Sequence, residues 1–289
     1  MFHSTGNPFK KLTNRQKDFY SRYQNRTDEY GFDPEILAQW EPIFRFFYEG
    51  YFDVKMIGVE NIPDEGRAIL VGNHSGGLPI DAIMLAIGIL NLHPSPRRIR
   101  PLALDWLHKT NIVGHVIRGM GAVPATMATA LKLLNDEELV TFYPEGARGT
   151  GKRYATRYRL HDFDPGFVKA ALLTGAPIIP ITTVGGDDIY PILTRINSLA
   201  KLLNMPYFPI TPTFPLLPIT SSCIPLPAKM LIKIGKPIAL DYPPEKVEDH
   251  KLRRRLARLV QFQIQRELNA MLRQRKNPFC DWSAQNLDL

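Results

Sequence analysis

The chain has 289 residues, of which 44% are hydrophobic and 22% charged, so it can bury a sizeable core and is not wholly disordered. Its net charge of +8 favours an anionic partner, either nucleic acid or a phospholipid surface. Cys223 and Cys280 form no metal-binding pattern and no disulfide framework, so a reducing compartment is expected. The N-terminus lacks the apolar core of a signal peptide, and the apolar runs are shorter than the ~18 residues of a membrane span. We therefore expect a chain that does not cross a bilayer, although it can lie on one.

The N-terminal part, residues 1–52, is expected to form a helical extension. Its first 33 residues are polar and show no clear period. Asp33 then provides an N-cap and Pro34 a first helical residue for an aromatic helix that reaches Phe52. Two interpretations of this helix stay open: it packs on the core, or it is an interfacial membrane anchor, since Trp and Tyr suit the membrane–water boundary.

Between residues 53 and 245, β-type runs alternate with helix-type runs, which predicts an α/β fold with a mostly parallel central sheet flanked by helices. The expected strands are Val54–Val59, Ala68–Gly72, Ile99–Leu104, Leu139–Tyr143, Ile178–Val184 and Met230–Ile234. The expected helices are Asp81–Asn91, Trp106–Met120, Ala125–Asn135, Gly166–Thr174 and Asp187–Leu203. Functional groups in such sheets gather beyond the carboxyl ends of the strands, which is where the loops NHSGG and PEGARG are expected.

The C-terminal third holds two further features. Residues 206–229 are dense in proline, which removes ladder donors, so we expect an irregular apolar surface loop. Residues 246–289 are expected to form a basic amphipathic helix, from Glu248 to Lys276, and a tail. Each arginine of this helix, taken singly, suits a solvated face, and together they suit a phospholipid-facing surface.

The first loop carries a possible acid–base pair. His74 follows the expected strand Ala68–Gly72, and Asp81 opens the next helix. A carboxylate on one ring nitrogen would fix the tautomer and stabilise the imidazolium, and the other nitrogen would act as a general base. Such a base can take the proton of an acceptor hydroxyl, which then attacks directly, so no nucleophilic Ser or Cys is needed. The alternative interpretation, from spacing alone, is that the two residues merely cap the strand and the helix.

The second loop resembles a phosphate-binding loop. Gly146 to Lys152 nearly matches G-x-x-x-x-G-K-[ST], but Arg153 stands where the Mg²⁺-binding hydroxyl belongs. This argues against ATP or GTP hydrolysis. A pocket for a phosphate or polar head group stays possible, with Arg148 clamping oxygens and Glu145 bonding a hydroxyl. Alternatively, Arg148 and Lys152 are solvated loop charges.

Four blocks in order resemble the glycerolipid acyltransferase family, the PlsC-type or lysophospholipid acyltransferases. They span about Asn73 to Val184, and all four occur in the family's order. They are Asn73-His74 with Asp81, Gly121 to Ala125 after Arg118, Tyr143-Pro144-Glu145-Gly146 with Arg148, and Ala176 to Pro180.

The resemblance implies transfer of a fatty acyl group from acyl-CoA or acyl carrier protein to the hydroxyl of a glycerolipid: lysophosphatidic acid, another lysophospholipid or a partial glyceride. It implies His74 as base and Asp81 as its orienter. Substrate binding would fall to Glu145, Gly146, Arg148, Gly121 and Arg118. No metal and no cofactor beyond the thioester co-substrate are implied.

The partners and location follow from the same resemblance and from the charge. We expect a peripheral protein on the cytoplasmic side of a membrane surface. Nucleic acid is not expected as a partner, because the chain has no zinc-finger, RNP or helix-turn-helix signature. A noncatalytic lipid-surface binding protein on the same fold is the competing hypothesis.

Three departures from the family pattern bear on these expectations. Six residues separate His74 from Asp81, where the family usually has four. Thr126 and Met127 occupy the neighbourhood where the family generally carries an arginine for the acceptor phosphate, which favours a neutral mono- or diacylglycerol or another lysolipid. The alternative is that nearby basic residues supply the charge instead: Arg118, Lys152, Arg153, Arg157 and Arg159. Tyr143 replaces the common Phe, a small change.

Overall fold

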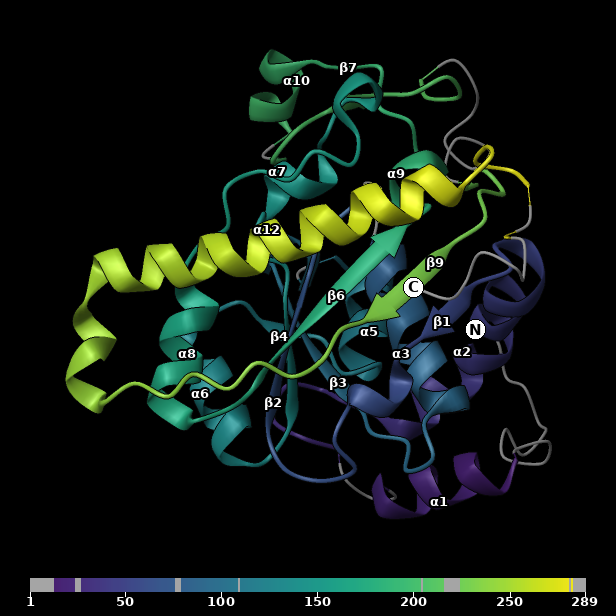
Figure 1. The fold of residues 1–289 in the computed structure, drawn as a ribbon. Helices are drawn as coiled ribbons and strands as arrows, with labels where there is room; N and C mark the ends of the chain where they lie inside the picture. The colour runs from purple at the N-terminus through teal and green to yellow at the C-terminus, as the bar shows by residue number, and fades with distance from the viewer. Residues whose placement is uncertain are drawn as a thin grey trace.

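A seven-stranded sheet forms the centre of the protein (Figure 1). The computed structural model describes residues 13–23, 27–75, 79–108, 110–203, 205–215, 224–280 and 282. In spatial order the strands are β1 (Lys55–Ile57), β9 (Leu231–Ile234), β6 (Ile178–Val184), β2 (Ala68–Gly72), β5 (Leu139–Phe142), β3 (Ile99–Ala103) and β4 (Val123–Pro124). The pairs from β6 to β4 are all parallel, and β9 pairs antiparallel to β6 and parallel to β1.

Helices cover both faces of this sheet, which confirms the predicted α/β class. The helices are α1 (Asn14–Tyr23), α2 (Pro34–Phe46), α3 (Ile80–Leu92), α4 (Asp105–His108), α5 (Ile112–Gly119), α6 (Met127–Asn135), α7 (Ala147–Thr150), α8 (Gly166–Thr174), α9 (Gly186–Ile189), α10 (Asn197–Leu202) and α12 (His250–Gln274). A π-helical turn (Phe47–Tyr51) extends α2, and 3-10 turns occupy Val59–Asn61, Tyr154–Thr156 and Pro244–Glu248.

The central strand β2 supplies side chains to two cores. Ile69 and Val71 belong to the core beneath α6, α8 and α12, whereas Ala68 and Leu70 belong to the core beneath α3 and the end of α2. Successive residues of a strand point to opposite faces, so a strand buried on both sides is apolar throughout. All five residues of β2 are buried.

The predicted aromatic helix packs mainly on the protein. Asp33 caps α2 by accepting from the N–H of Glu35 at 2.8 Å, as predicted. Tyr48 and Phe52, which follow, are buried in the core beneath α3. Ile43 and Phe46 nevertheless remain exposed, so the structure also leaves an apolar edge on this segment.

Two predicted helices are interrupted. The segment Trp106–Met120 divides into α4 and α5, because the Thr110 hydroxyl donates to Leu107 O at 2.7 Å and accepts from the Gly114 N–H at 2.8 Å. A side chain that bonds nearby backbone groups in this way competes with the helix ladder.

The second interrupted segment, Asp187–Leu203, contains Pro191, which has no N–H and disfavours a helical residue before it. It divides into α9, the short strand β7 (Thr194–Arg195) and α10. β7 pairs with β8 (Pro209–Ile210), so the prediction of no sheet in the proline-rich loop is wrong at these two residues. Residues 216–223 of that loop, including Cys223, lie outside the described residues.

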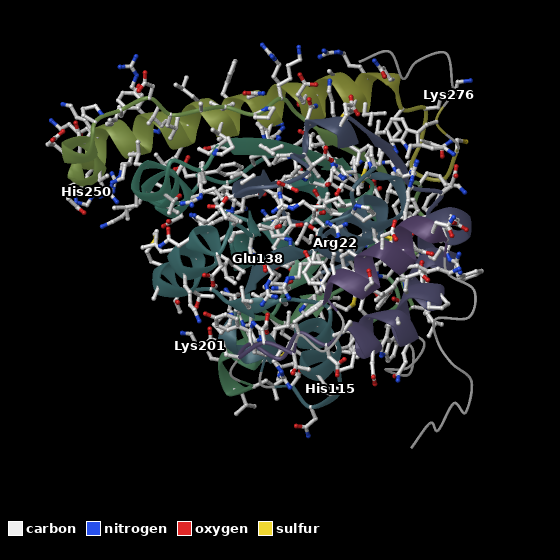
Figure 2. The ribbon with its side chains drawn as sticks, turned by 90° about the horizontal axis from the view of Figure 1, so that it is seen from below. Arg22, His115, Glu138, Lys201, His250 and Lys276 are labelled. Atoms are coloured by element: carbon white, nitrogen blue, oxygen red, sulfur yellow. The ribbon has the colours of Figure 1, made fainter. Side chains whose placement is uncertain are left out.

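The long C-terminal helix was predicted nearly to its ends. Asp249 caps α12 by accepting from the N–H of Leu252, and residues such as Ile264 and Leu268 are fully buried against β6 and α8. Figure 2 shows its outer side chains pointing away from the sheet between His250 and Lys276. Among the described residues, no helix is both long and apolar enough to span a membrane.

At its far end, α12 is tied to the loop after β6. Arg275 Nη1 donates to Asp188 Oδ2 at 2.5 Å, and the Tyr158 hydroxyl donates to the same oxygen at 2.5 Å. The side chains of Arg275 and Asp188 are 5% and 2% exposed. This buried charge network connects the end of α12 to α9 at the carboxyl edge of the sheet.

Truncation within α12 tests its place in the core. We expect Ile264→Ala to lower the free energy of unfolding by about 2–5 kcal/mol, since it opens a cavity at a fully buried site. Phe262→Ala is the matched control, because Phe262 is 67% exposed on the same helix and should change stability by under about 0.5 kcal/mol. Chemical denaturation measures both, and equal losses would contradict the packing described above.

Candidate active site

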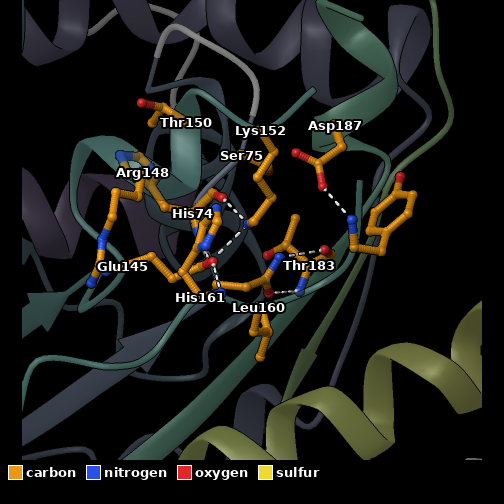
Figure 3. A network of polar contacts seen from close by, with 12 residues as sticks. His74, Ser75, Glu145, Arg148, Thr150, Lys152, Leu160, His161, Thr183 and Asp187 are labelled. Atoms are coloured by element: carbon orange, nitrogen blue, oxygen red, sulfur yellow. Dashed lines mark hydrogen bonds and ion pairs between the residues drawn. The ribbon is translucent and has the colours of Figure 1, made fainter. Parts of the chain in front are cut away.

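The two loops singled out in the sequence lie side by side, because the strands that precede them are neighbours. β2 and β5 pair in parallel with Val71 opposite Phe142. The segments Asn73-His74 and Tyr143 to Glu145 therefore leave the sheet at the same carboxyl edge, where α/β folds collect functional groups. Figure 3 shows His74, Glu145 and Lys152 gathered there.

Asp81, in the first turn of α3, faces the ring of His74. Its Oδ2 lies 2.8 Å from His74 Nδ1 and accepts from the N–H of Ser75 at 3.0 Å. Its Oδ1 accepts from the N–H of Ala82 at 2.8 Å. The side chain of Asp81 is 1% exposed and that of His74 17%. The longer spacing between the two residues therefore still closes into a pair, although Gly76 to Leu78 lie outside the described residues.

This contact decides which ring nitrogen is available for chemistry. A carboxylate at Nδ1 favours the tautomer with its proton there, which leaves Nε2 to accept a proton and stabilises the imidazolium that results. The tautomer is assigned from this contact. The ring also stacks on Tyr143, with ring centroids 4.3 Å apart and an interplanar angle of 21°. Burial and the nearby Asp81 carboxylate raise the pKa of Tyr143 well above its ordinary value, so the phenol stays protonated at neutral pH.

A buried ion pair holds the backbone of His74 (Figure 3). Lys152 Nζ donates to Glu145 Oε1 at 2.9 Å and to the carbonyl of His74 at 3.0 Å. Glu145 Oε1 also accepts from the N–H of His74 at 3.2 Å, and Oε2 accepts from the N–H of His161 at 2.8 Å. The side chains of Lys152 and Glu145 are 1% and 0% exposed. The pair therefore grips both sides of the His74 residue.

The close approach of the two loops depends on a glycine. A Cβ at Gly149 would lie 2.9 Å from the Cβ of Glu145 and 3.0 Å from the Cβ of His74. Both distances are shorter than Cβ contacts normally allow. Any larger residue at this position would push the loops apart, so the glycine of the PEGARG segment has a packing role.

Neighbouring strands brace the first loop as well. The side-chain amide of Asn73 donates to the carbonyl of Thr183 at 2.9 Å, and its oxygen accepts from the N–H of Thr183 at 2.8 Å. Asp187 lies in α9, just after β6, and burial raises its pKa to about 6. The nearby Lys152 ammonium and the N–H that Tyr158 donates at 2.9 Å act in the opposite direction and lower this pKa. His74 is thus fixed from β6 and from the PEGARG loop together.

A cavity of about 440 Å³ opens beside His74. Its walls come from the PEGARG loop, the strand β3 and the helices α3, α5 and α6, and they are largely apolar. Typical wall residues are Ile83, Leu102, Ile117 and Met120. A cavity of this size and polarity suits a small ligand or part of an aliphatic chain.

The sequence also predicted substrate-binding residues on the second loop. Of these, Gly146 lines the cavity, whereas Glu145 and Arg148 do not. The carboxylate of Glu145 is engaged in the buried pair, and exposed Arg148 donates to the carbonyl of Asp162 at 3.0 Å.

Gly121 and Arg118 are not among the residues that line the cavity. Gly121 has a φ of +107° and passes close to the carbonyl of Ile99, and Arg118 donates to the carbonyl of His108. Their neighbours Met120 and Ala122 line the cavity. The acceptor-binding roles of Glu145, Arg148, Gly121 and Arg118 stay predictions.

Sequence reasoning did not predict that Lys152 and Asn73 brace the site through internal hydrogen bonds. The likeness of Gly146 to Lys152 to a phosphate loop did point to Lys152, but the ammonium bonds a carboxylate and a carbonyl inside the protein. Asn73 carried no signal beyond its place next to His74. Among the described residues, no group of three or more His, Cys, Asp or Glu side chains is arranged to hold a metal ion.

The chain matches a known protein family. Residues 53–184 match the family model described as Acyltransferase. An uncharacterised protein of Mycobacterium tuberculosis (strain ATCC 25618 / H37Rv) is 43% identical over 256 residues, which are 87% of this chain and 71% of that protein.

More distant relatives have named activities. Phytyl ester synthase 1, chloroplastic, of Arabidopsis thaliana is 30% identical over 54% of this chain and 23% of its own. The 1-acyl-sn-glycerol-3-phosphate acyltransferase of Bacillus subtilis (strain 168) is 27% identical over 46% and 63%. The solved structure of the 1-acyl-sn-glycerophosphate acyltransferase PlsC from Thermotoga maritima aligns with a TM-score of 0.49 and 20% identity, covering 81% of this chain and 78% of that one. The match to the Acyltransferase model and the named activity of the Bacillus relative show that this chain belongs to the glycerolipid acyltransferase family.

Proposed function

We propose that the protein is an O-acyltransferase that moves a fatty acyl group from acyl-CoA or acyl carrier protein to the hydroxyl of a glycerolipid. The observation that carries this proposal is the pairing of His74 with Asp81 at the wall of an apolar cavity. The name of the Bacillus relative supports a glycerolipid acceptor. Phosphorylated and neutral glycerolipids are both candidate acceptors.

The proposed reaction is a single acyl transfer. Nε2 of His74 takes the proton of the acceptor hydroxyl, and the oxygen attacks the thioester carbonyl carbon. A C–O bond forms, the C–S bond breaks, and the departing thiolate receives the proton from the imidazolium. Asp81 stabilises that imidazolium while it exists. The step needs no metal and no co-reactant other than the thioester.

Removal of the base tests the proposal directly. We expect His74→Ala to lower kcat by roughly 10²–10⁴-fold, because the hydroxyl loses its proton acceptor. Release of thiol from acyl-CoA in the presence of a glycerolipid measures the rate. His115→Ala is the control, since this histidine is exposed on α5. Undiminished turnover in the His74 variant would reject the assignment of the base, and a wild-type protein that binds lipid without turnover would favour the noncatalytic alternative.

The Glu145–Lys152 pair is proposed to position His74. We expect Lys152→Met to destabilise the fold by about 3–5 kcal/mol, because it leaves the Glu145 carboxylate buried without its cation. The double variant Glu145→Gln/Lys152→Met should recover part of that stability, and its kcat should fall more than its KM changes. Chemical denaturation and steady-state kinetics check this, and additive losses of stability in the double variant would show that the pair is not coupled.

We also propose that the protein is peripheral on the cytoplasmic face of a membrane. Support comes from the β7–α10 segment, where Leu193, Ile196, Leu202 and Leu203 are 39–79% exposed. The chain contains no Asp or Glu from Ile189 to Leu240. Figure 1 shows β7 and α10 together at the end of the molecule beyond α7. Apolar side chains beside cations suit an anionic lipid surface.

Vesicle co-sedimentation tests this docking. Leu202→Asp/Leu203→Asp should reduce binding to vesicles that contain anionic phospholipid by at least about tenfold, because charge would have to enter the interface. Leu259→Asp/Phe262→Asp, on exposed positions of α12, is the control and should bind as the wild type does. Loss of binding only in the α12 variant would assign docking to the basic helix instead.

A further inference from the structure

His74 is the only basic side chain among the described residues that line the cavity. Its lining includes neither lysine nor arginine among the residues that the structure describes. The ionisable lining groups are His74, Tyr143 and Asp164. A phosphate placed among these walls would lack a cation, and burial of an unpaired charge costs several kcal/mol.

Four basic side chains on segments near the cavity bond the protein's own backbone or carboxylates. Lys152 is buried between Glu145 and the carbonyl of His74. Arg148 donates to the carbonyl of Asp162, and Arg118 to the carbonyl of His108. Arg157 lies with Nε 3.3 Å from Asp188 Oδ1. Each of these residues would have to leave a partner to reach a phosphate in the cavity.

A carboxylate also stands at the cavity rim. Asp164 is exposed and lines the cavity, and its Oδ1 accepts from the N–H of Gly166 at 2.8 Å. A phosphate near it would be repelled, because like charges raise the energy of both groups. The rim therefore disfavours an anionic acceptor.

The remaining polar groups on the walls are hydroxyls. Thr126, Thr150 and Tyr143 line the cavity. A hydroxyl both donates and accepts hydrogen bonds, so it suits another hydroxyl or an ester group better than it neutralises a charge. Together with the apolar walls, these groups fit a long-chain lipid whose polar part is an uncharged alcohol.

We propose that the acceptor is a neutral lipid alcohol, such as a partial glyceride, and not a phosphorylated lysolipid. This inference rests on the proposed acyltransferase function and narrows it to one class of acceptor. The acceptor hydroxyl nearest His74 is acylated, and the acceptor carries no phosphate group into the cavity. Selectivity comes from the cost of bringing an anion to walls whose described residues include no lysine or arginine.

A matched pair of acceptors tests it. A 1-monoacylglycerol and a lysophosphatidic acid with the same acyl chain differ only in the phosphate, and both are presented with one labelled acyl-CoA and, separately, with acyl carrier protein thioester. We expect kcat/KM to be at least about tenfold higher for the monoacylglycerol, corresponding to a difference of about 1.4 kcal/mol. An equal or higher value for lysophosphatidic acid overturns the inference and leaves the proposed function standing. Turnover of neither acceptor with either donor overturns both.

A gain of charge gives the complementary test. Met127 is half-buried, lines the cavity and starts α6, so a guanidinium at this position would face the acceptor. We expect Met127→Arg to shift the ratio of kcat/KM values toward lysophosphatidic acid by at least about tenfold, and the uncharged control Met127→Gln to leave the ratio within about threefold. An unchanged ratio in a folded Met127→Arg variant, judged by thermal unfolding, would mean that the missing cation does not set acceptor selectivity.

Discussion

The site depends on one buried ion pair. The carboxylate of Glu145 and the ammonium of Lys152 are almost completely removed from solvent, and their mutual attraction alone rarely repays that desolvation. Here the remaining hydrogen-bonding capacity is directed at the backbone of His74 and His161. The polar atoms of the pair have hydrogen-bond partners only when the loop after β2 lies against the loop after β5. The need to satisfy these buried charges therefore fixes how the two loops pack. The position of His74 follows from that condition.

The site then divides into two sides with different physical properties. On one side lie the Asp81 carboxylate and the hydrogen bonds that hold His74, and on the other lies the apolar cavity. A general base needs an oriented, polarised ring, whereas a lipid needs walls that release water. Placing the ring of His74 at the boundary serves both needs. In the loop that resembles a phosphate-binding sequence, Lys152 points into the protein and bonds Glu145 and the carbonyl of His74. The lysine is therefore engaged within the protein, so the sequence similarity does not indicate phosphate binding.

Distant parts of the chain support this arrangement. Arg275, at the end of α12, bonds Asp188 in the turn after β6, and the same turn brings Gly186 against Ser75, next to His74. A Cβ at Gly186 would clash with the Ser75 hydroxyl oxygen. The C-terminal helix is therefore part of the scaffold behind the site, in addition to presenting exposed arginines on its outer side.

Local patterns in the sequence determined the α/β class, most strand positions, the long C-terminal helix and the two functional loops. They did so because hydrophobic period, capping residues and proline act over a few neighbouring residues. The breaks at Thr110 and Pro191 carried local signals that the broader apolar pattern concealed. Only the tertiary structure decided that Asp81 reaches His74 across six residues, that Lys152 turns inward, and that no lysine or arginine is among the described residues of the cavity walls. These facts depend on which segments become neighbours when β2 and β5 pair, and spacing along one chain does not contain that information.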